Sequence, residues 1–151
     1  MLRKQKRKSM TKEIDVDKKE LLEFLNANRT GHLATVEEDK PRVRAIGIVK
    51  ADDDGILIQT WKSKDLSKQL EQNANVEFCF NNFEKRIQIR VRGKVTPAED
   101  DATKQMVLKE RPQFQRLVEG GREMAIYRLK NGTAHVWTMQ NNFEPKIFIS
   151  L

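Results

Sequence analysis

The chain has 151 residues, of which 38% are hydrophobic, with 29 basic residues against 22 acidic ones. This length predicts one domain with its own core and excludes two domains of ordinary size. Residues 13–151 hold 23 basic and 22 acidic residues, because six basic residues precede the first acidic residue, Glu13. A nearly neutral body argues against a nucleic-acid-binding domain.

Residues 1–12, MLRKQKRKSMTK, form a basic segment that we expect to be a disordered leader ahead of a single domain at 13–151. The leader lacks the apolar stretch of a secretory signal and the length of a membrane span, so no membrane association is expected. Cys79 is the only cysteine, which excludes an intrachain disulfide and a multi-cysteine metal site. We therefore expect a cytoplasmic protein without a metal. Contact of the leader with nucleic acid or an anionic surface is a lesser alternative.

The first predicted element is a helix over residues 17–28, followed by a short strand at 32–36. Asp17 and Glu20 match a capping box at the helix start. The apolar stripe of the helix consists of Leu21, Leu22 and Leu25.

A strand–turn–strand–helix unit comes next. Residues 42–50 and 56–60 read as two paired strands, because the acidic segment ADDDG between them has turn chemistry. The following segment, WKSKDLSKQLEQN, predicts an amphipathic helix with Ser63 as its N-cap and Asn73 as its stop. Its apolar face is formed by Leu66 and Leu70.

The remaining elements are mainly strands. A buried strand is predicted at 76–80, and residues 86–95 alternate strictly between apolar and polar side chains. Residues 96–99 match a capping box with proline at the first helical position, which predicts a helix to about Glu110 and a short helical turn at 113–118. The tail predicts strands at 124–130, 133–139 and 145–151, with a tight turn at Asn131-Gly132. About eight short strands favour an antiparallel barrel with flanking helices.

The start of the second helix is a candidate anion site. Lys62, Ser63 and Lys64 lie beside the free N–H groups at the positive end of the helix dipole. Arg44, on the strand predicted to pair with residues 56–60, would reach the same anion, and arginine suits phosphate recognition. A solvated lysine-rich helix start and an exposed strand arginine are the alternatives.

Other polar and aromatic residues carry weaker signals. Gln88 lies on the polar face of an alternating strand, where its amide could read a heterocycle edge or face solvent. Trp61 and Trp137 are candidates for ring stacking, although core or rim positions are more common. His32 and His135 are expected to be structural. No Walker loop, GxGxxG, GxSxG or HExxH motif occurs, so a phosphate would be held by side chains and a helix start.

Three segments in this order carry a family resemblance: GHLATVEEDKPRVRAIGIV, ILIQTWKSKDLSKQLEQNANVEFCF and RIQIRVRGKV. Over residues 17–96 the chain resembles the pyridoxamine 5′-phosphate oxidase-like proteins, the FMN-binding split barrels. The resemblance implies a mainly β fold, a six-stranded antiparallel split β-barrel with flanking helices. It also implies a homodimer with FMN bound at the subunit interface.

The family's cofactor-binding residues map onto positions of this chain. Arg44 corresponds to the arginine that opens the FMN-contacting strand, and the backbone of Ala45, Ile46 and Gly47 would lie along the isoalloxazine. Gln59 and Thr60 match a tyrosine-threonine pair, with glutamine replacing the tyrosine. Gln88 matches a glutamine that reaches the flavin from the partner strand. The phosphate clamp corresponds to Lys62, Ser63 and Lys64, with a shorter connection and a changed residue order.

The reaction is less defined than the cofactor. Val49 replaces a lysine of the true oxidases, and the chain ends at Leu151 without their substrate-binding extension, which argues against pyridoxamine phosphate as the substrate. The resemblance implies an oxidoreductase that passes hydride or electrons between a reduced nicotinamide and a small-molecule acceptor. No residue stands out as an obligatory acid or base. A non-catalytic flavin- or haem-binding module and a deazaflavin-dependent reductase stay open as alternatives.

Overall fold

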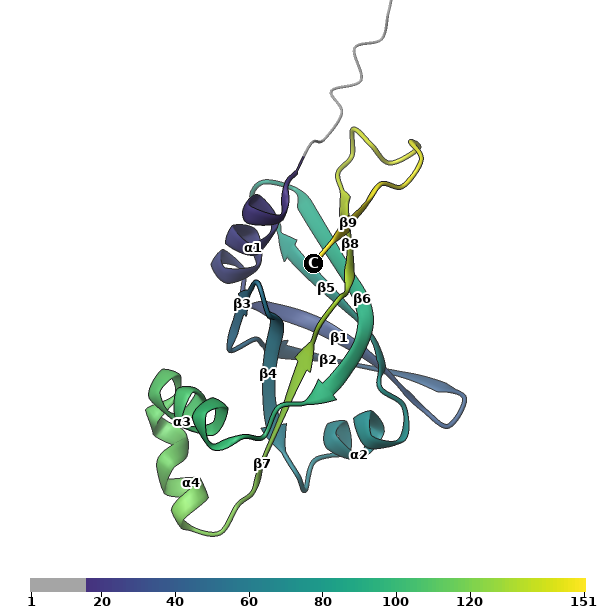
Figure 1. Cartoon of the computed structure of the whole chain (residues 1–151). Coiled ribbons are helices and arrows are strands. Elements are labelled where there is room, and N and C mark those ends of the chain that lie inside the picture. The colour runs from purple at the N-terminus through teal and green to yellow at the C-terminus, as the bar shows by residue number, and fades with distance from the viewer. Residues whose placement is uncertain (1–15) are drawn as a thin grey trace, which may run out of the picture.

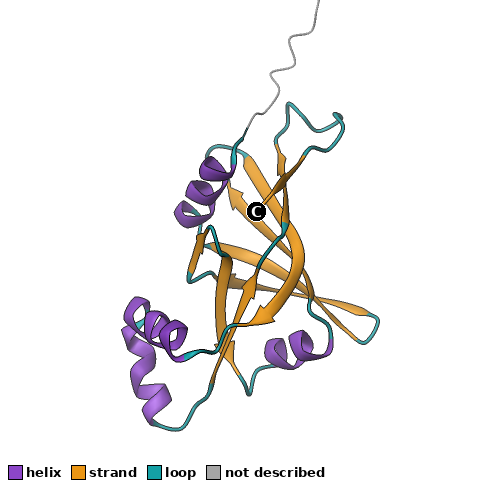
Figure 2. Cartoon of the chain, viewed as in Figure 1, coloured by secondary structure: helices purple, strands orange, loops and turns teal. Residues whose placement is uncertain are grey.

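The computed structural model describes residues 16–151, and the predicted leader at 1–12 lies outside them. The chain forms a strongly curved antiparallel sheet with helices at its flanks (Figures 1 and 2). The helices are α1 (Lys18–Ala27), α2 (Asp65–Gln72), α3 (Asp101–Glu110), the 3₁₀ turn η1 (Pro112–Phe114) and α4 (Gln115–Glu119). The strands are β1 (Thr30–Glu37), β2 (Lys40–Gly47), β3 (Lys50–Asp52), β4 (Gly55–Trp61), β5 (Asn75–Asn82), β6 (Ile87–Pro97), β7 (Met124–Leu129), β8 (Thr133–Trp137) and β9 (Phe148–Ser150). No helix among residues 16–151 is long and apolar enough to cross a membrane.

The predicted fold class is confirmed, with nine strands in the described residues instead of the six that the resemblance implied. The strand order is β2-β1-β5-β6-β7-β4-β3, and β8 pairs with both β6 and β9. Two of the additional strands, β3 and β9, have only three residues each. The long β6 pairs with β5 and β8 along its first part and with β7 at its end, so it links the β1–β5 side of the sheet to the β4–β7 side.

The strand predicted at 42–50 is divided in two. The N–H of Ile48 donates to the carbonyl of Arg29, whereas the N–H of Val49 donates to the carbonyl of Leu57. The chain therefore leaves β1 and joins β4 between these two residues. As a result β2, which carries Arg44, pairs with β1, and of the two halves only β3 pairs with β4. The predicted pairing of the Arg44 strand with residues 56–60 is therefore wrong.

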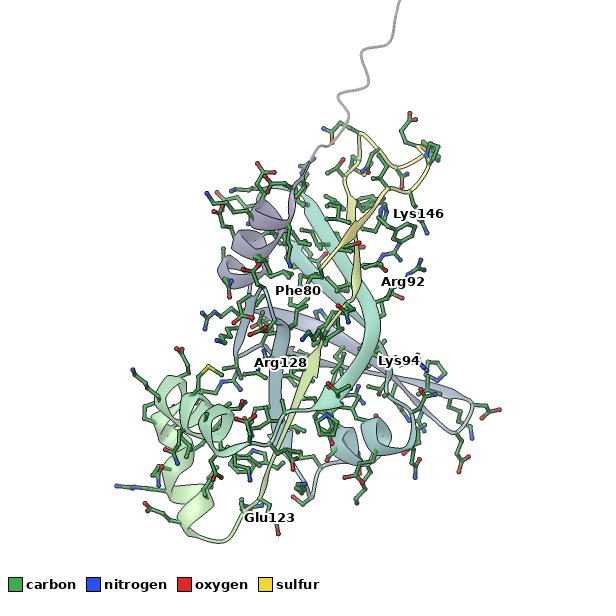
Figure 3. All side chains as sticks on the ribbon, viewed as in Figure 1. Phe80, Arg92, Lys94, Glu123, Arg128 and Lys146 are labelled. Atoms are coloured by element: carbon green, nitrogen blue, oxygen red, sulfur yellow. The ribbon has the colours of Figure 1, made fainter. Side chains whose placement is uncertain are left out.

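The core fills the barrel and the space beneath α1. Phe78 and Phe80 on β5 are fully buried and stacked, with ring centroids 5.1 Å apart. The predicted α1 is confirmed, including its capping box and the burial of Leu21 and Leu25. The predicted alternation of β6 is also confirmed: Ile89 and Val91 are buried, while Arg92 and Lys94 point outward (Figure 3).

The start of α3 differs from its prediction. Residues 96 and 97 belong to β6, because Thr96 and Pro97 are paired with β7 and are not free to open a helix. The helix begins at Asp101, after the N-cap Asp100, whose carboxylate accepts bonds from the backbone N–H and the hydroxyl of Thr103 at 2.9 and 2.8 Å. These hydrogen bonds lower the pKa of Asp100 from its ordinary value of 3.8.

Replacing Asp100 with alanine is expected to lower the thermal unfolding midpoint at neutral pH, because the first N–H groups of α3 lose their cap. The pKa of Asp100 is lower in the folded state than in the unfolded state. The cap therefore contributes its full stabilisation at pH values above the unfolded-state pKa, and this stabilisation is lost as the pH falls through the folded-state pKa. Thermal unfolding at several pH values checks this, with Thr96→Ala as the control. An equal effect of both substitutions would contradict the assignment of Asp100 as the N-cap.

The predicted turn at Asn131-Gly132 does not join two paired strands, as a type I′ turn of a hairpin would. The chain does turn here, with Asn131 at a φ of 56°. However, β7 pairs with β4 and β6, whereas β8 pairs with β6 and β9. A Cβ on Gly132 would clash with the side chain of Leu129, so glycine allows close packing over the core here.

Candidate functional site

A cleft of about 830 Å³ opens between β2, β4, the start of α2 and the segment that follows α3. Its size is typical of small-molecule sites. It gathers seven of the ten residues predicted to bind a cofactor: Arg44, Ala45, Ile46, Gly47, Gln59, Thr60 and Lys64. Although β2 and β4 are not paired, the turn from β2 through β3 into β4 brings the end of each strand to this cleft.

Arg44 is half-buried and anchored within the sheet. Its Nη1 donates to the carbonyl of Leu33 at 3.0 Å and to the hydroxyl of Thr35 at 2.8 Å, and its Nη2 donates to Oε1 of Gln69. Thr35 and Gln69 are both buried and also bond each other. Burial lowers the pKa of Arg44, and the charge of Asp65 opposes this. The guanidinium is therefore held in one orientation at the wall of the cleft.

Lys64 occupies the helix start. It is the N-cap of α2 in place of the predicted Ser63, and no side chain caps the helix. The predicted stop at Asn73 and the burial of Leu66 and Leu70 are confirmed. Because the first N–H groups of a helix lack intrahelical acceptors, the cleft here offers backbone donors beside an exposed ammonium group.

Lys62 and Ser63 do not line the cleft. The Nζ of Lys62 forms an ion pair with Glu99 at 3.0 Å, and the hydrogen bond to that carboxylate raises the pKa of Lys62. Ser63 is exposed to solvent. Of the three residues predicted as a phosphate clamp, the structure brings only Lys64 to the cleft.

The floor of the cleft is built from β4 and the end of β2. The buried Gln59 donates from Nε2 to the carbonyl of Thr60 at 2.6 Å, which fixes its amide. Ala45, Ile46 and Gly47 run along the cleft beside it. Trp61 also lines the cleft and packs edge-on against Phe114, with ring centroids 5.3 Å apart.

Gln88 lies outside the cleft, on β6. Its Nε2 donates to Oδ1 of Asn81 at 3.1 Å, and it pairs in register with Trp137 of β8. Trp137 also stands apart from the cleft and donates to Asn142. Neither Gln88 nor Trp137 therefore lines this cleft.

Arg111 is a residue of the cleft that sequence reasoning missed, as are Gln69 and Phe114. It is half-buried at the C-cap of α3, and its Nη2 donates to the carbonyl of Gly47 at 2.8 Å. Its Nη1 donates to Oε1 of Gln59 at 3.4 Å. Burial and the nearby charge of Arg29 lower the pKa of Arg111, while Glu110 opposes this. The only local signal was an arginine before a proline at a helix end.

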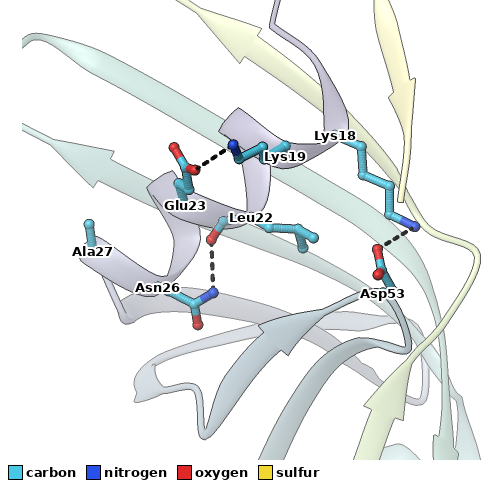
Figure 4. A pocket seen from close by; sticks show the side chains of 7 residues that line it. All are labelled: Lys18, Lys19, Leu22, Glu23, Asn26, Ala27 and Asp53. Atoms are coloured by element: carbon cyan, nitrogen blue, oxygen red, sulfur yellow. Dashed lines mark hydrogen bonds and ion pairs between the residues drawn. The ribbon is translucent and has the colours of Figure 1, made fainter.

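A second hollow, of about 780 Å³, lies between α1 and the turn that joins β3 to β4 (Figure 4). Its two lysines are paired, Lys18 with Asp53 at 3.6 Å and Lys19 with Glu23 at 4.0 Å. The side-chain amide of Asn26 donates to the carbonyls of Leu22 and Ala51. None of the predicted binding residues lines this hollow, and its charges are already balanced, so the first cleft is the candidate site.

Solved structures share the fold. A NimC/NimA family protein from Clostridium acetobutylicum is 28% identical, with a TM-score of 0.73 over 88% of this chain and 92% of that one. A protein from the same organism related to general stress protein 26, of the pyridoxinephosphate oxidase family, is 16% identical, with a TM-score of 0.69 over 90% and 97%. The heme storage protein HutZ from Vibrio cholerae is 18% identical, with a TM-score of 0.59 over 75% and 88%.

No curated protein matches the chain. Residues 17–138, however, match the family described as pyridoxamine 5′-phosphate oxidase, which covers most of the chain and extends beyond the three segments that carried the resemblance. The chain therefore belongs to the pyridoxamine 5′-phosphate oxidase family.

Proposed function

We propose that this protein is a cytoplasmic flavoprotein that binds FMN in the cleft between β2, β4 and α2. The observation that carries the proposal is a surplus of positive charge in the cleft. Arg44 and Arg111 are both half-buried there, and neither forms an ion pair with a carboxylate among residues 16–151. The phosphate of FMN, bound beside Arg44, would compensate the cost of burying the charge of Arg44.

The residues of the cleft fit FMN. Lys64, Arg44 and the uncapped start of α2 form one end, where a phosphate would receive donors from side chains and backbone. Ala45 to Gly47 and Gln59 form the other end, where the ring would lie along the strand. Lys62, Ser63 and Gln88 do not line this cleft, and we propose no direct role for Lys62 or Ser63 within it.

We further propose that the protein is an oxidoreductase, which passes hydride or electrons between a reduced nicotinamide and a small-molecule acceptor. When bound, the flavin would supply the redox chemistry. The chain would hold the phosphate with Lys64 and Arg44 and orient the ring against Gly47 and Gln59. Residues 13–151 would act as one domain, since one continuous sheet runs through the described part.

The position of Gln88 leads to a proposal about assembly. If Gln88 contacts the flavin, it does so from a second copy of the chain, because it lies outside its own cleft. A homodimer with two interfacial sites would place Lys64 and Gln88 of different subunits around each flavin. Val43, at the rim of the cleft, is 69% exposed, as expected for an apolar residue that a second copy covers.

Mixing two variants tests this arrangement. Lys64→Ala and Gln88→Ala are each expected to weaken FMN binding in the pure proteins. After unfolding and refolding together, mixed dimers would contain one intact site each, so part of the high-affinity binding should return. Fluorescence titration with FMN measures it, and each variant refolded alone is the control. If no high-affinity binding returns, Lys64 and Gln88 do not share a site across subunits.

The absorption spectrum of freshly purified protein tests the cofactor. A bound flavin, a deazaflavin and a haem have different spectra, and we expect that of a flavin. Anaerobic addition of a reduced nicotinamide should then bleach the visible flavin absorption if the protein is an oxidoreductase. Bound flavin that no nicotinamide reduces would favour a non-catalytic flavin-binding module.

A haem-binding module is the second candidate, and the similarity to the heme storage protein HutZ is the observation behind it. This similarity rests on the fold, at 18% identity. His135 is buried and its Nδ1 lies 3.4 Å from the carbonyl of Ile147, so it does not face the cleft. A Soret band in the purified protein would support haem binding over the flavin proposal.

A further inference from the structure

The cleft holds two half-buried guanidinium groups at different positions along β2. Arg44 is itself a residue of β2, near the start of α2. Arg111 is anchored to the carbonyl of Gly47, three residues further along the strand, which corresponds to about 10 Å. The guanidinium of Arg44 bonds Thr35, which lies opposite Arg42 and therefore on the side away from Gly47. One small phosphate cannot contact both guanidinium groups, so that of Arg111 is available for another ligand.

The backbone and side chain of Arg111 are held in place, but some N–H donors of its guanidinium group form no hydrogen bond within the described part of the chain. Its backbone N–H closes the last turn of α3 on Val107, and the following Pro112 restricts its conformation. Its Nη1 and Nη2 each make one bond to the floor of the cleft. An arginine carries five N–H donors, and therefore three have no acceptor within the described part of the chain.

Aromatic side chains flank this guanidinium. The ring centroid of Phe114 lies 5.8 Å from Cζ of Arg111, and Trp61 packs edge-on against Phe114. All three residues line the cleft. A planar ligand would thus meet an aromatic wall beside a fixed cation with free donors.

We propose that Arg111 is a specificity-determining residue that binds the carboxylate of a small planar or aromatic acid, which enters the cleft as the second substrate. The inference rests on the proposed function, because the flavin ring would lie along Ala45 to Gly47, next to Arg111. The flavin phosphate is assigned to the opposite end, at Lys64 and Arg44. The two guanidinium groups thereby serve different ligands.

Benzoate and benzamide are matched probes for this site, since they share the planar body and differ in charge. Calorimetric titration of the FMN-loaded protein is expected to show benzoate binding on the order of tenfold more tightly than benzamide. Arg111→Gln should abolish this preference, and Arg111→Lys should keep only part of it, because lysine lacks the planar fork. Arg116→Gln, an exposed arginine outside the cleft, is the control and should change nothing.

The affinity for FMN relative to riboflavin shows whether Arg111 binds the flavin phosphate or the carboxylate of a second substrate. Arg111→Gln should leave this ratio within about twofold of the wild-type value, whereas a loss of the ratio would make Arg111 a phosphate ligand and overturn the inference. Equal binding of benzoate and benzamide by the wild-type protein would also overturn it, with no variant needed. If the wild-type protein binds no FMN, the proposed function fails, and the same two probes titrated into flavin-free protein still test Arg111 alone.

Discussion

Replacing Arg44 with methionine is expected to weaken both the fold and the cofactor site. The change removes the guanidinium donors to Leu33, Thr35 and Gln69 while nearly keeping the length of the side chain, although the hydroxyl of Thr35 still donates to Gln69. A buried acceptor left without a donor costs about 1 to 3 kcal/mol, so the free energy of unfolding should fall by about this amount. Loss of a charge-assisted bond to the FMN phosphate should weaken FMN binding by a further 1.5 to 3 kcal/mol or so.

Urea unfolding and FMN titration measure the two effects of Arg44→Met separately. Arg42→Met is the matched control for stability, because Arg42 is an exposed neighbour whose ion pair with Glu37, at 2.8 Å, lies at the surface. Exposed pairs contribute about 0 to 1 kcal/mol, so this control should stay close to the wild-type stability. Equal stability of both variants would show that the buried bonds of Arg44 contribute little.

Replacing Lys64 with alanine is expected to weaken FMN binding by about 1.5 to 3 kcal/mol, or roughly 10- to 150-fold, without destabilising the protein. Lys64 is exposed and makes no ion pair in the described part of the chain. A lysine at a helix N-terminus is also unfavourable with the helix dipole. Thermal unfolding should therefore show an unchanged or slightly higher midpoint.

Lys68→Ala is the control for Lys64→Ala. Lys68 is an exposed lysine of the same helix, but it does not line the cleft. Flavin fluorescence titration should give the wild-type affinity for this control. If both lysine variants bind FMN equally well, the start of α2 does not hold the phosphate.

The sequence predicted those elements whose signals are local. The capping box of α1, the alternation of β6 and the amphipathic face of α2 all depend on residues within one or two turns of each other, and the structure confirms them. The fold class followed from the number of short strands and from the family resemblance. Seven of the ten predicted binding residues meet in one cleft, because most of them lie on β2 and β4, whose ends border it.

Strand pairing was less predictable because it depends on distant partners. A turn forms within the predicted range 51–55, but it is confined to Asp53 and Asp54. β2 finds its partner in β1, and the Asn131-Gly132 turn joins strands that do not pair. Thr96 and Pro97 imitate a helix start, yet pairing with β7 keeps them in the sheet. Arg111 reaches the cleft because the C-cap of α3 lies within reach of Gly47 at the end of β2, which no local pattern indicates.

Comparative titration with FMN and riboflavin tests the central claim most directly, because the two ligands differ only by the phosphate that the start of α2 and Arg44 are proposed to bind. The wild-type protein is expected to bind FMN at least about tenfold more tightly than riboflavin, and Lys64→Ala should narrow this preference. Equal affinity of the wild-type protein for the two flavins, or no affinity for either, would contradict the assignment of this cleft as an FMN site.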